Sequence, residues 1–329
     1  MSTQNTMRAI SQDVLGGPEV LKEVEVERPA PRPNEVLVRV RAAGVNPTDW
    51  KHRATGGFLG EPPFVLGWDV SGVVEAVGIG VAAFAPGDEV FGMLPYPYGH
   101  GSHAEYVIAP VRALARKPAG IDHVQAGALP LVSLTSWQAL VEHADLRSGQ
   151  RVLIHAAAGG VGHVAVQIAK ARGAHVIGTA SAGKHEFLRE IGVDEAVDYR
   201  ETDFTEAVKD VDVVLDTIGG DNSLRSLRVL RPGGVVVSIL PGGSDDFYKE
   251  AERLGVRAVR MLVDADRTGM ETIAELAGTG RLRATIAELA GTGRLRATIA
   301  GTFPLAAAAE AHASGDTGRT TGKLVLVND

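Results

Sequence analysis

The chain of 329 residues contains no cysteine. Disulfides, thiolate nucleophiles and zinc sites built on thiolates are therefore excluded. The sequence also has no run of 18 apolar residues, which a membrane-spanning helix would need. Its first ten residues, MSTQNTMRAI, have no apolar core of the kind found in a secretory signal peptide. These last two absences predict a cytoplasmic protein.

Basic residues are also outnumbered, because 33 lysines and arginines stand against 40 acidic residues and leave a net charge of -7. Such a chain lacks the basic surface that attracts nucleic acid. A content of 45% hydrophobic and 22% charged residues is typical of globular proteins, and the length predicts two domains. We therefore expect neither nucleic acid nor a membrane as a partner.

The first third of the chain has the pattern of short β-strands. Branched apolar residues gather at 35–45, 71–78 and 87–93, and turns such as Gly17-Pro18 and Pro62-Pro63 separate the strand regions. Short strands with glycine-rich joints predict a small barrel-like β domain.

Strands and helices alternate after about residue 121, and a helix is expected over 123–144. Six apolar runs predict strands, and the segments between them have helical spacing. This alternation is typical of a parallel, doubly wound sheet. The predicted strands are 151–158, 175–180, 195–199, 211–220, 233–240 and 256–263, and the helices are 161–173, 182–192, 223–230 and 248–255. The tail, 322–329, is expected to form a last strand.

A perfect repeat lies near the C-terminal end. The segment IAELAGTGRLRAT occupies 273–285 and recurs at 286–298. This period is too short for a solenoid unit. We interpret the repeat as a tandem duplication or a sequence artefact, absorbed as an insertion at an exposed connection.

The strongest chemical motif is the turn from Ala157 to Gly162, which follows a predicted strand and opens a predicted helix. A dinucleotide pyrophosphate requires a close backbone approach at a helix N-terminus. The turn reads A-x-G-x-x-G, so Ala157 replaces the first glycine of the usual fingerprint. The alternative is a glycine-rich turn that only packs the helix on the sheet.

The choice of cofactor depends on the end of the second strand. NAD-specific enzymes place an acidic residue there for the ribose 2′-hydroxyl. The stretch 178–184 has no acid but offers Ser181 and Lys184, which suit a 2′-phosphate. The sequence therefore favours NADPH, although Lys184 could also be an ordinary exposed lysine at a helix start.

Several spaced segments resemble the medium-chain dehydrogenase/reductase superfamily in the order that this family uses. They are 42–51, 67–78, 87–93, 134–140, 155–180 and 322–327. The resemblance implies an α/β protein with a Rossmann doubly wound parallel sheet plus a GroES-like β-barrel catalytic domain. It places the catalytic domain at 1–126 and 267–329, and the dinucleotide-binding domain at 127–266.

Two positions indicate which branch the chain resembles. The zinc-dependent alcohol dehydrogenases have a cysteine ligand where Asn46 stands and a histidine ligand where Trp68 stands. The chain is therefore similar to the zinc-free quinone oxidoreductases, which implies no metal and a hydride transfer from NADPH to a quinone or conjugated carbonyl. An enoyl or alkenal reductase and a non-enzymatic NADPH-binding regulator remain as alternatives.

The resemblance also implies site residues. Asn46 and Asp49 would lie at the nicotinamide end of the site, with Lys51 as a third catalytic candidate, and Asn46 could instead only shape a turn. Candidate proton donors are Asn46, Lys51, His52 and solvent. The cofactor-binding candidates are Thr135, Ala158, Gly159, Gly160, Val161, Gly162, Ser181, Lys184, Tyr199, Thr217, Ser238, Leu240 and Lys323.

The acceptor pocket departs from the family pattern. The tyrosines that often follow the Asn46–Asp49 motif in quinone reductases are missing. We expect other aromatic residues to form the pocket wall, with ordinary domain packing as the alternative. These are Trp50, Phe58, Tyr96 and Tyr98. The family also implies a homodimer, formed through the edge strand at 256–263.

Overall fold

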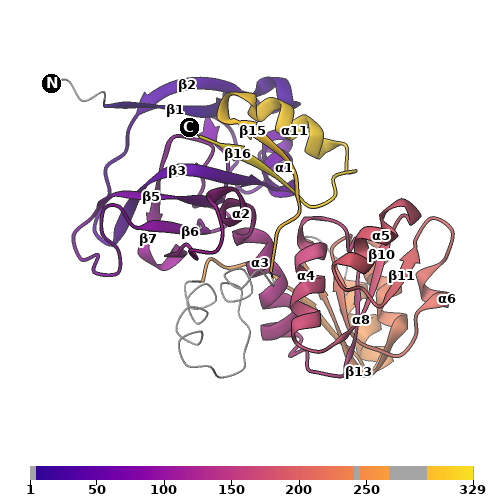
Figure 1. The fold of residues 1–329 in the computed structure, drawn as a ribbon. Helices are drawn as coiled ribbons and strands as arrows, with labels where there is room; N and C mark the ends of the chain where they lie inside the picture. The colour runs from indigo at the N-terminus through magenta and orange to yellow at the C-terminus, as the bar shows by residue number, and fades with distance from the viewer. Residues whose placement is uncertain (1–4, 241–244, 267–294, 329) are drawn as a thin grey trace. The chain divides into compact units, whose positions relative to one another are not determined.

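The computed structural model describes residues 5–240, 245–266 and 295–328 (Figure 1). Within these residues the chain forms two compact units. Unit one contains 5–131, 264–266 and 295–328, and unit two contains 132–240 and 245–263. The sequence predicted domain boundaries at 126/127 and 266/267. These remain predictions, because the division into compact units does not test them. The repeat lies outside the described residues except for its last four, 295–298.

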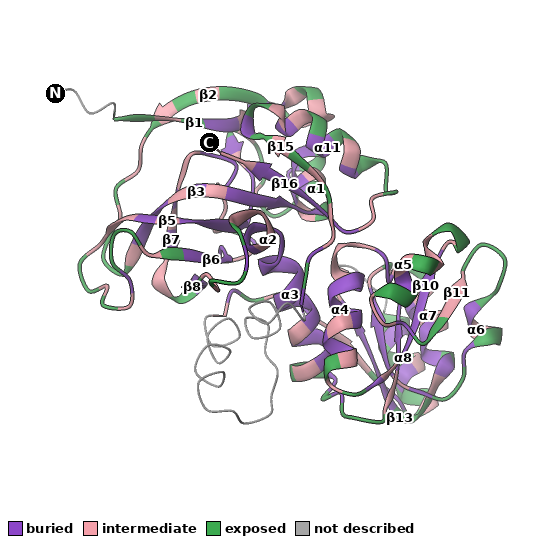
Figure 2. Ribbon diagram, viewed as in Figure 1, coloured by how far each residue is buried: buried purple, intermediate pink, exposed green. Residues whose placement is uncertain are grey.

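Unit one is built on two β-sheets, as its strand-rich sequence predicts. The larger sheet has the order β15-β16-β3-β5-β6-β8, with β7 paired to β3, and the smaller has the order β2-β1-β4. Most residues of β3, β5 and β16 are buried (Figure 2). The strands are β1 (Thr6–Gln12), β2 (Lys22–Glu27), β3 (Glu35–Val45), β4 (Phe64–Val65), β5 (Asp69–Val77), β6 (Glu89–Met93), β7 (Tyr106–Pro110), β8 (Leu114–Arg116), β15 (Ile299–Pro304) and β16 (Lys323–Val327).

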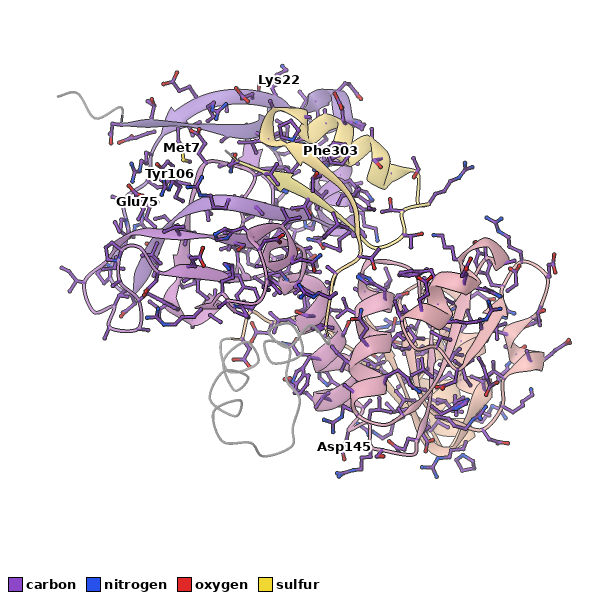
Figure 3. All side chains as sticks on the ribbon, viewed as in Figure 1. Met7, Lys22, Glu75, Tyr106, Asp145 and Phe303 are labelled. Atoms are coloured by element: carbon purple, nitrogen blue, oxygen red, sulfur yellow. The ribbon has the colours of Figure 1, made fainter. Side chains whose placement is uncertain are left out.

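Strands from distant parts of the sequence join in unit one. The C-terminal strand β16 pairs antiparallel with β3, so both chain ends contribute to the larger sheet. Arg28, just beyond β2, forms an ion pair with Glu75 (2.9 Å) and lies 4.0 Å from the ring centre of Tyr106. Figure 3 labels both partners on the same side of this unit. These contacts tie the smaller sheet to the larger one.

The helices of unit one include two that the sequence patterns did not predict. They are α1 (Pro47–Thr55) and α11 (Ala308–Asp316), and α2 (His123–Ala128) also belongs here. Helix α1 begins at a proline, whose missing N–H costs nothing at the first helical position. The Asp49 carboxylate accepts the Asn46 N–H at 2.6 Å and closes the first turn.

Unit two has one parallel sheet of six strands in the order β11-β10-β9-β12-β13-β14. Counted from β9, this is the 3-2-1-4-5-6 order of the Rossmann fold, so the predicted fold class is confirmed. Its strands are β9 (Arg151–Ile154), β10 (His175–Ala180), β11 (Glu195–Asp198), β12 (Val211–Asp216), β13 (Leu230–Ser238) and β14 (Arg257–Arg260). Its helices include α4 (Gly160–Ala171), α5 (His185–Glu190), α6 (Phe204–Ala207), α7 (Asp221–Ser226) and α8 (Asp245–Leu254).

Several predicted elements differ from those observed; for example, the strand expected over 211–220 ends at Asp216. The helix expected over 123–144 is divided into α2, α3 (Pro130–Trp137) and a π-helix (Gln138–His143). The break falls at Pro130, which has no N–H for a continuous helix. The strand expected over 151–158 ends at Ile154, because Ala156 adopts a φ of 47° and turns the chain.

A pair of buried histidines connects α11 to the core of unit one. The rings of His103 and His312, both 0% exposed, lie edge to face at 5.7 Å. Arg53, which pairs with Asp316 at 2.8 Å, also lies 3.4 Å from the His312 Nδ1 atom. Burial lowers the pKa of His103 to about 3, and burial together with His103 and Arg53 lowers that of His312 to about 2. Both rings are therefore neutral near pH 7.

We expect acid to destabilise unit one through these histidines. Their folded pKa values lie below the ordinary 6.5, so the unfolded chain binds more protons and the stability present above about pH 6.5 falls as the pH drops. The slope is about 1.4 kcal/mol per histidine and pH unit. Urea unfolding measures the free energy of unfolding at pH 7 and at pH 5. The decrease from pH 7 to pH 5 should be smaller for His312→Gln than for the wild type, and the same as in the wild type for the exposed His143→Asn. An equal loss in all three proteins would contradict this role.

Candidate dinucleotide site and buried polar cluster

The predicted phosphate-binding turn joins β9 to α4 at the carboxyl end of the sheet in unit two. The Gly159 N–H donates to the Ala156 carbonyl at 2.8 Å and closes the turn directly before α4. The first N–H groups of a helix have no partner within the helix. Together with the helix dipole, they make this end of α4 a site for the negative charge of a pyrophosphate.

The glycines of this turn allow a close backbone approach. A Cβ on Gly162 would lie 2.3 Å from the Ala156 oxygen and 2.7 Å from the Ala157 Cα, so only glycine fits there. A Cβ on Gly178 of β10 would lie 2.9 Å from the Ala157 Cβ. The bare Gly178 therefore leaves space for the methyl group of Ala157. This explains how alanine is accepted at the first position of the fingerprint.

Two side chains that sequence reasoning missed hold the turn in place. Thr179 accepts the Ala156 N–H on its Oγ1 atom (3.2 Å) and the Ala157 N–H on its carbonyl (3.0 Å). The His155 ring lies 3.2 Å from the Thr179 Oγ1 and 3.1 Å from the Ser226 Oγ. Burial lowers the pKa of His155 to about 4, so the ring is neutral. The only sequence signal for this role was the hydroxyl of Thr179, one position before the end of β10.

A buried carboxylate organises the loop after β12. Asp216 accepts the N–H groups of Ile218 (3.0 Å) and Gly219 (3.1 Å), and the hydroxyls of Ser223 and Ser238. Burial raises its pKa, but the hydrogen bonds from Ser223 and the loop N–H groups lower it further than burial raises it. The loop is thus held at the sheet edge, where doubly wound folds bind ligands.

Two predicted cofactor residues use their hydroxyls within this framework. Thr217 donates to the His155 carbonyl at 2.9 Å, and Ser238, 1% exposed, donates to Asp216 at 3.1 Å. Leu240 follows β13, the strand that ends at Ser238. It lies close to Gly219, because a Cβ added at Gly219 would be 3.1 Å from the Leu240 Cβ. Thr135 is buried at 4% exposure. The hydrogens of the Thr217 and Ser238 hydroxyls are therefore used within unit two, and only their acceptor lone pairs and the backbone remain for a cofactor.

The residues predicted for the 2′-phosphate follow β10 and β11. Ser181 and Lys184 are partly buried, and Tyr199 is 56% exposed. The Arg200 guanidinium lies 5.8 Å from the Tyr199 ring centre. Asp198, which is not among the predicted site residues, accepts the Ala182 N–H at 3.0 Å. An acid thus lies beside this loop, with its carboxylate bonded to the backbone.

Unit one contains a cluster of buried polar side chains at the joined ends of β3, β5 and β16. Lys323 is 2% exposed, and Asn46, Asp49 and Asp69 are 0% exposed. The Lys323 ammonium donates to the Asn46 side-chain oxygen, to the Val45 carbonyl (3.2 Å) and to Asp69 (3.3 Å). The Asn46 amide nitrogen donates to Asp69 at 2.9 Å, which fixes the orientation of the amide.

Burial shifts the pKa values in this cluster. It raises the pKa of Asp49 to about 7, against the hydrogen bond from the Asn46 N–H and with a further rise from the Asp69 charge. Burial also raises the pKa of Asp69 and lowers that of Lys323, while their mutual attraction opposes both shifts. The Asp69 carboxylate additionally accepts the Leu131 N–H at 2.6 Å. The hydrogen bonds of Lys323 described here are therefore all within unit one. Its predicted contact with a cofactor remains a prediction.

The four predicted pocket aromatics lie in three places. The Phe58 and Tyr96 rings meet edge to face at 6.2 Å. Trp50 lies against Gly315 of α11, where a Cβ would be 2.6 Å from its ring, and Tyr98 is 74% exposed. Only Phe58 and Tyr96 are thus brought together. Lys51 is exposed on α1.

Two features of other protein classes are not found in the described part of the chain. None of its histidine, aspartate and glutamate side chains gather in a group of three or more that could hold a metal ion. None of the helices among the same residues is long and apolar enough to cross a membrane.

Comparisons with known proteins identify the family to which this chain belongs. Residues 32–119 match the alcohol dehydrogenase GroES-like domain, and residues 191–326 match a family described as zinc-binding dehydrogenase. The quinone oxidoreductase of Mus musculus is 33% identical, over 98% of this chain and 98% of that protein. The chain belongs to the quinone oxidoreductase family. Within the medium-chain dehydrogenases/reductases this confirms the resemblance seen in the sequence.

Other similar proteins agree in fold and activity class. The mitochondrial NAD(P)H oxidoreductase RTN4IP1 of Mus musculus is 34% identical, over 89% of this chain and 82% of that protein. The structure of the quinone oxidoreductase from Coxiella burnetii superimposes with a TM-score of 0.89, at 36% identity, covering 98% of this chain and 100% of that one. That of the Escherichia coli quinone oxidoreductase complexed with NADPH gives 0.86, at 29% identity, with the same coverage. The protein is thus an NAD(P)H-dependent oxidoreductase.

Proposed function

We propose that the protein is an NADPH-dependent, zinc-independent reductase that transfers a hydride to a quinone or a conjugated carbonyl. The observation that carries this proposal is the turn between β9 and α4. In this turn the backbone of Ala156 and Ala157 lies so close to Gly162 that no side chain fits there. Such a cradle at the carboxyl edge of a Rossmann sheet fits the pyrophosphate of a dinucleotide.

The residues of unit two would bind and orient the dinucleotide, which supplies the hydride when bound. The N-terminus of α4 holds the pyrophosphate, and Thr179 and His155 keep the turn before it rigid. Asp216 fixes the neighbouring loop, so that its backbone is preorganised at the same edge. Fixed positions of this kind lower the barrier of a transfer between two bound reactants.

Zinc independence is supported by the chemistry of the side chains in unit one. The chain has no cysteine. The Trp68 indole donates to the Pro97 carbonyl at 3.1 Å, and the Asn46 amide is bonded to Lys323 and Asp69. The Lys323 ammonium already balances the charge of Asp69. These residues do not fit a zinc ion, so we assign no step of the reaction to one.

A preference for NADPH follows from Ser181, Lys184 and Tyr199. We expect Lys184→Ala to weaken NADPH binding about 10-fold, because a charge-assisted hydrogen bond to the 2′-phosphate contributes about 1.5 kcal/mol or more. NADH binding should stay unchanged. Nicotinamide fluorescence titrations measure both affinities, with the exposed Lys249→Ala as control. Equal losses for the two cofactors, or none, would contradict the assignment of Lys184.

The acceptor class is tested by following NADPH oxidation at 340 nm with a panel of quinones and enones. Turnover of quinones supports the proposal. Turnover of enones alone would identify an enoyl or alkenal reductase. Tight NADPH binding without turnover of any acceptor would favour the regulator.

We also propose a homodimer in which β14 pairs with its copy in a second chain. This strand lies at one end of the six-stranded sheet in unit two. An unpaired edge strand otherwise invites uncontrolled association. Sedimentation equilibrium tests the dimer, and a proline at Ala258 should weaken it. The cytoplasmic location stays a prediction, since the RTN4IP1 relatives carry a mitochondrial name.

A further inference from the structure

A chain of hydrogen bonds in unit one leads to a phenol that the family motifs leave without a chemical role. Thr48 and His52 lie one turn apart on α1. The Thr48 Oγ1 atom is 3.1 Å from the Tyr96 hydroxyl and 3.1 Å from the His52 Nδ1. The same Nδ1 is 2.7 Å from the Thr48 carbonyl oxygen.

The acceptors fix the direction of the protons in this chain. A carbonyl oxygen only accepts, so the His52 Nδ1 must carry a hydrogen. That N–H points towards both Thr48 oxygens, and Oγ1 therefore accepts from it. The Thr48 hydroxyl hydrogen is then directed to the Tyr96 oxygen. The hydroxyl hydrogen of Tyr96 is not used in this series of hydrogen bonds, so it can be donated to another group.

The surroundings of Tyr96 suit a flat, conjugated acceptor. Phe58, 45% exposed, lies edge to face with Tyr96, and the centre of the buried Trp68 ring is 5.3 Å from that of the Tyr96 ring. His52 is 4% exposed and packs 5.1 Å from the same indole. Burial, opposed by the bond from Thr48, raises the pKa of Tyr96 above its usual value, so the phenol keeps its proton near neutral pH. An apolar face thus lies beside a fixed hydroxyl donor.

We propose that Tyr96 donates its hydroxyl hydrogen to the carbonyl oxygen of the acceptor, and that Thr48 and His52 are positioning residues for this donor. This inference rests on the proposed function. As the β carbon of the enone or quinone takes up the hydride and its electron pair, the C=C π electrons shift towards the carbonyl carbon and the carbonyl π electrons move to the oxygen. The oxygen takes the Tyr96 proton, which gives an enol, and solvent returns a proton to the tyrosinate. With a quinone, this enol becomes the hydroquinone when the carbon that received the hydride loses a proton to solvent and the second oxygen gains one. A donor aimed at developing oxyanion charge contributes about 100-fold to such a step.

The decisive variant is Tyr96→Phe, which keeps the ring and removes the donor. We expect kcat for the best quinone or enone to fall about 100-fold, with the KM for NADPH unchanged. Thr48→Val should lower kcat about 10-fold, while Thr48→Ser restores it. The control is Tyr248→Phe on α8, 47% exposed and far along the sequence. Wild-type kcat in Tyr96→Phe would overturn the proposal and leave the proposed function intact.

A second measurement does not require turnover. The absorption band of 4-nitrophenolate, an oxyanion on a flat ring, shifts when a hydroxyl donates to it. We expect the wild type to bind and shift this dye, and Tyr96→Phe to bind it at least 10-fold more weakly. Such binding in a protein that reduces no acceptor would refute the proposed function but support the donor. Binding that is absent, or equal in both proteins, would overturn the role of Tyr96.

Discussion

Replacing Gly162 with alanine is expected to lower the affinity for NADPH about 100-fold and to destabilise unit two by about 1–3 kcal/mol. The added methyl group would lie 2.3 Å from the Ala156 oxygen and 2.7 Å from the Ala157 Cα. Both neighbours are backbone atoms, so α4 must move away from the turn. The prediction runs against helix propensity, since alanine stabilises a helix interior by about 1 kcal/mol relative to glycine. Urea unfolding and fluorescence titration measure the two effects.

Gly159→Ala is the matched comparison within the same turn. A Cβ there would meet only the Ala156 oxygen, at 3.2 Å. Its loss of stability should therefore be smaller than that of Gly162→Ala. If Gly162→Ala is as stable as the wild type and binds NADPH equally well, the close approach has no role in binding.

Replacing Lys323 with methionine is expected to destabilise unit one by about 3–5 kcal/mol at pH 7. The change removes the cation that lies 3.3 Å from Asp69 and leaves the buried carboxylate with only the neutral donors of Asn46 and Leu131. Burial already raises the pKa of Asp69, and loss of the cation raises it further. A carboxyl with a raised pKa favours the folded state as the pH falls, so the deficit should shrink between pH 7 and pH 5.

Two further variants separate charge from packing at Lys323. Adding Asp69→Asn to Lys323→Met removes the unpaired charge and should restore about half of the lost stability. Lys249→Met, on the exposed face of α8, should change the free energy of unfolding by less than about 0.5 kcal/mol. A loss in Lys323→Met that does not vary with pH would contradict the electrostatic account.

The sheet of unit two was predictable from the sequence because its strands are buried on both faces. The runs around Leu153, Ile177, Val214 and Val236 are nearly continuous in apolar residues, and all four of these are 0% exposed. Periodicity also located the helix after Gly160. Helices α1 and α11 were missed because α1 carries charged and polar residues on several sides, and α11 is rich in small residues.

The candidate site was predictable only where its chemistry depends on backbone shape. The turn at Gly159–Gly162 is a local pattern, and the structure shows why Gly162 must be glycine. The roles of Thr179, Asp216 and Lys323 depend on which strands lie side by side. Lys323 and Asn46 are 277 positions apart and meet only because β16 pairs with β3. No spacing rule in the sequence reports such a contact.

We propose that the protein reduces an acceptor with NADPH and without zinc. The most direct measurement is the rate of NADPH oxidation by p-benzoquinone before and after exhaustive dialysis against EDTA, repeated with NADH. We expect the same rate before and after the dialysis, and a kcat/KM at least 10-fold higher for NADPH than for NADH. Activity that disappears with the chelator and returns with added zinc, or a preference for NADH, would contradict it.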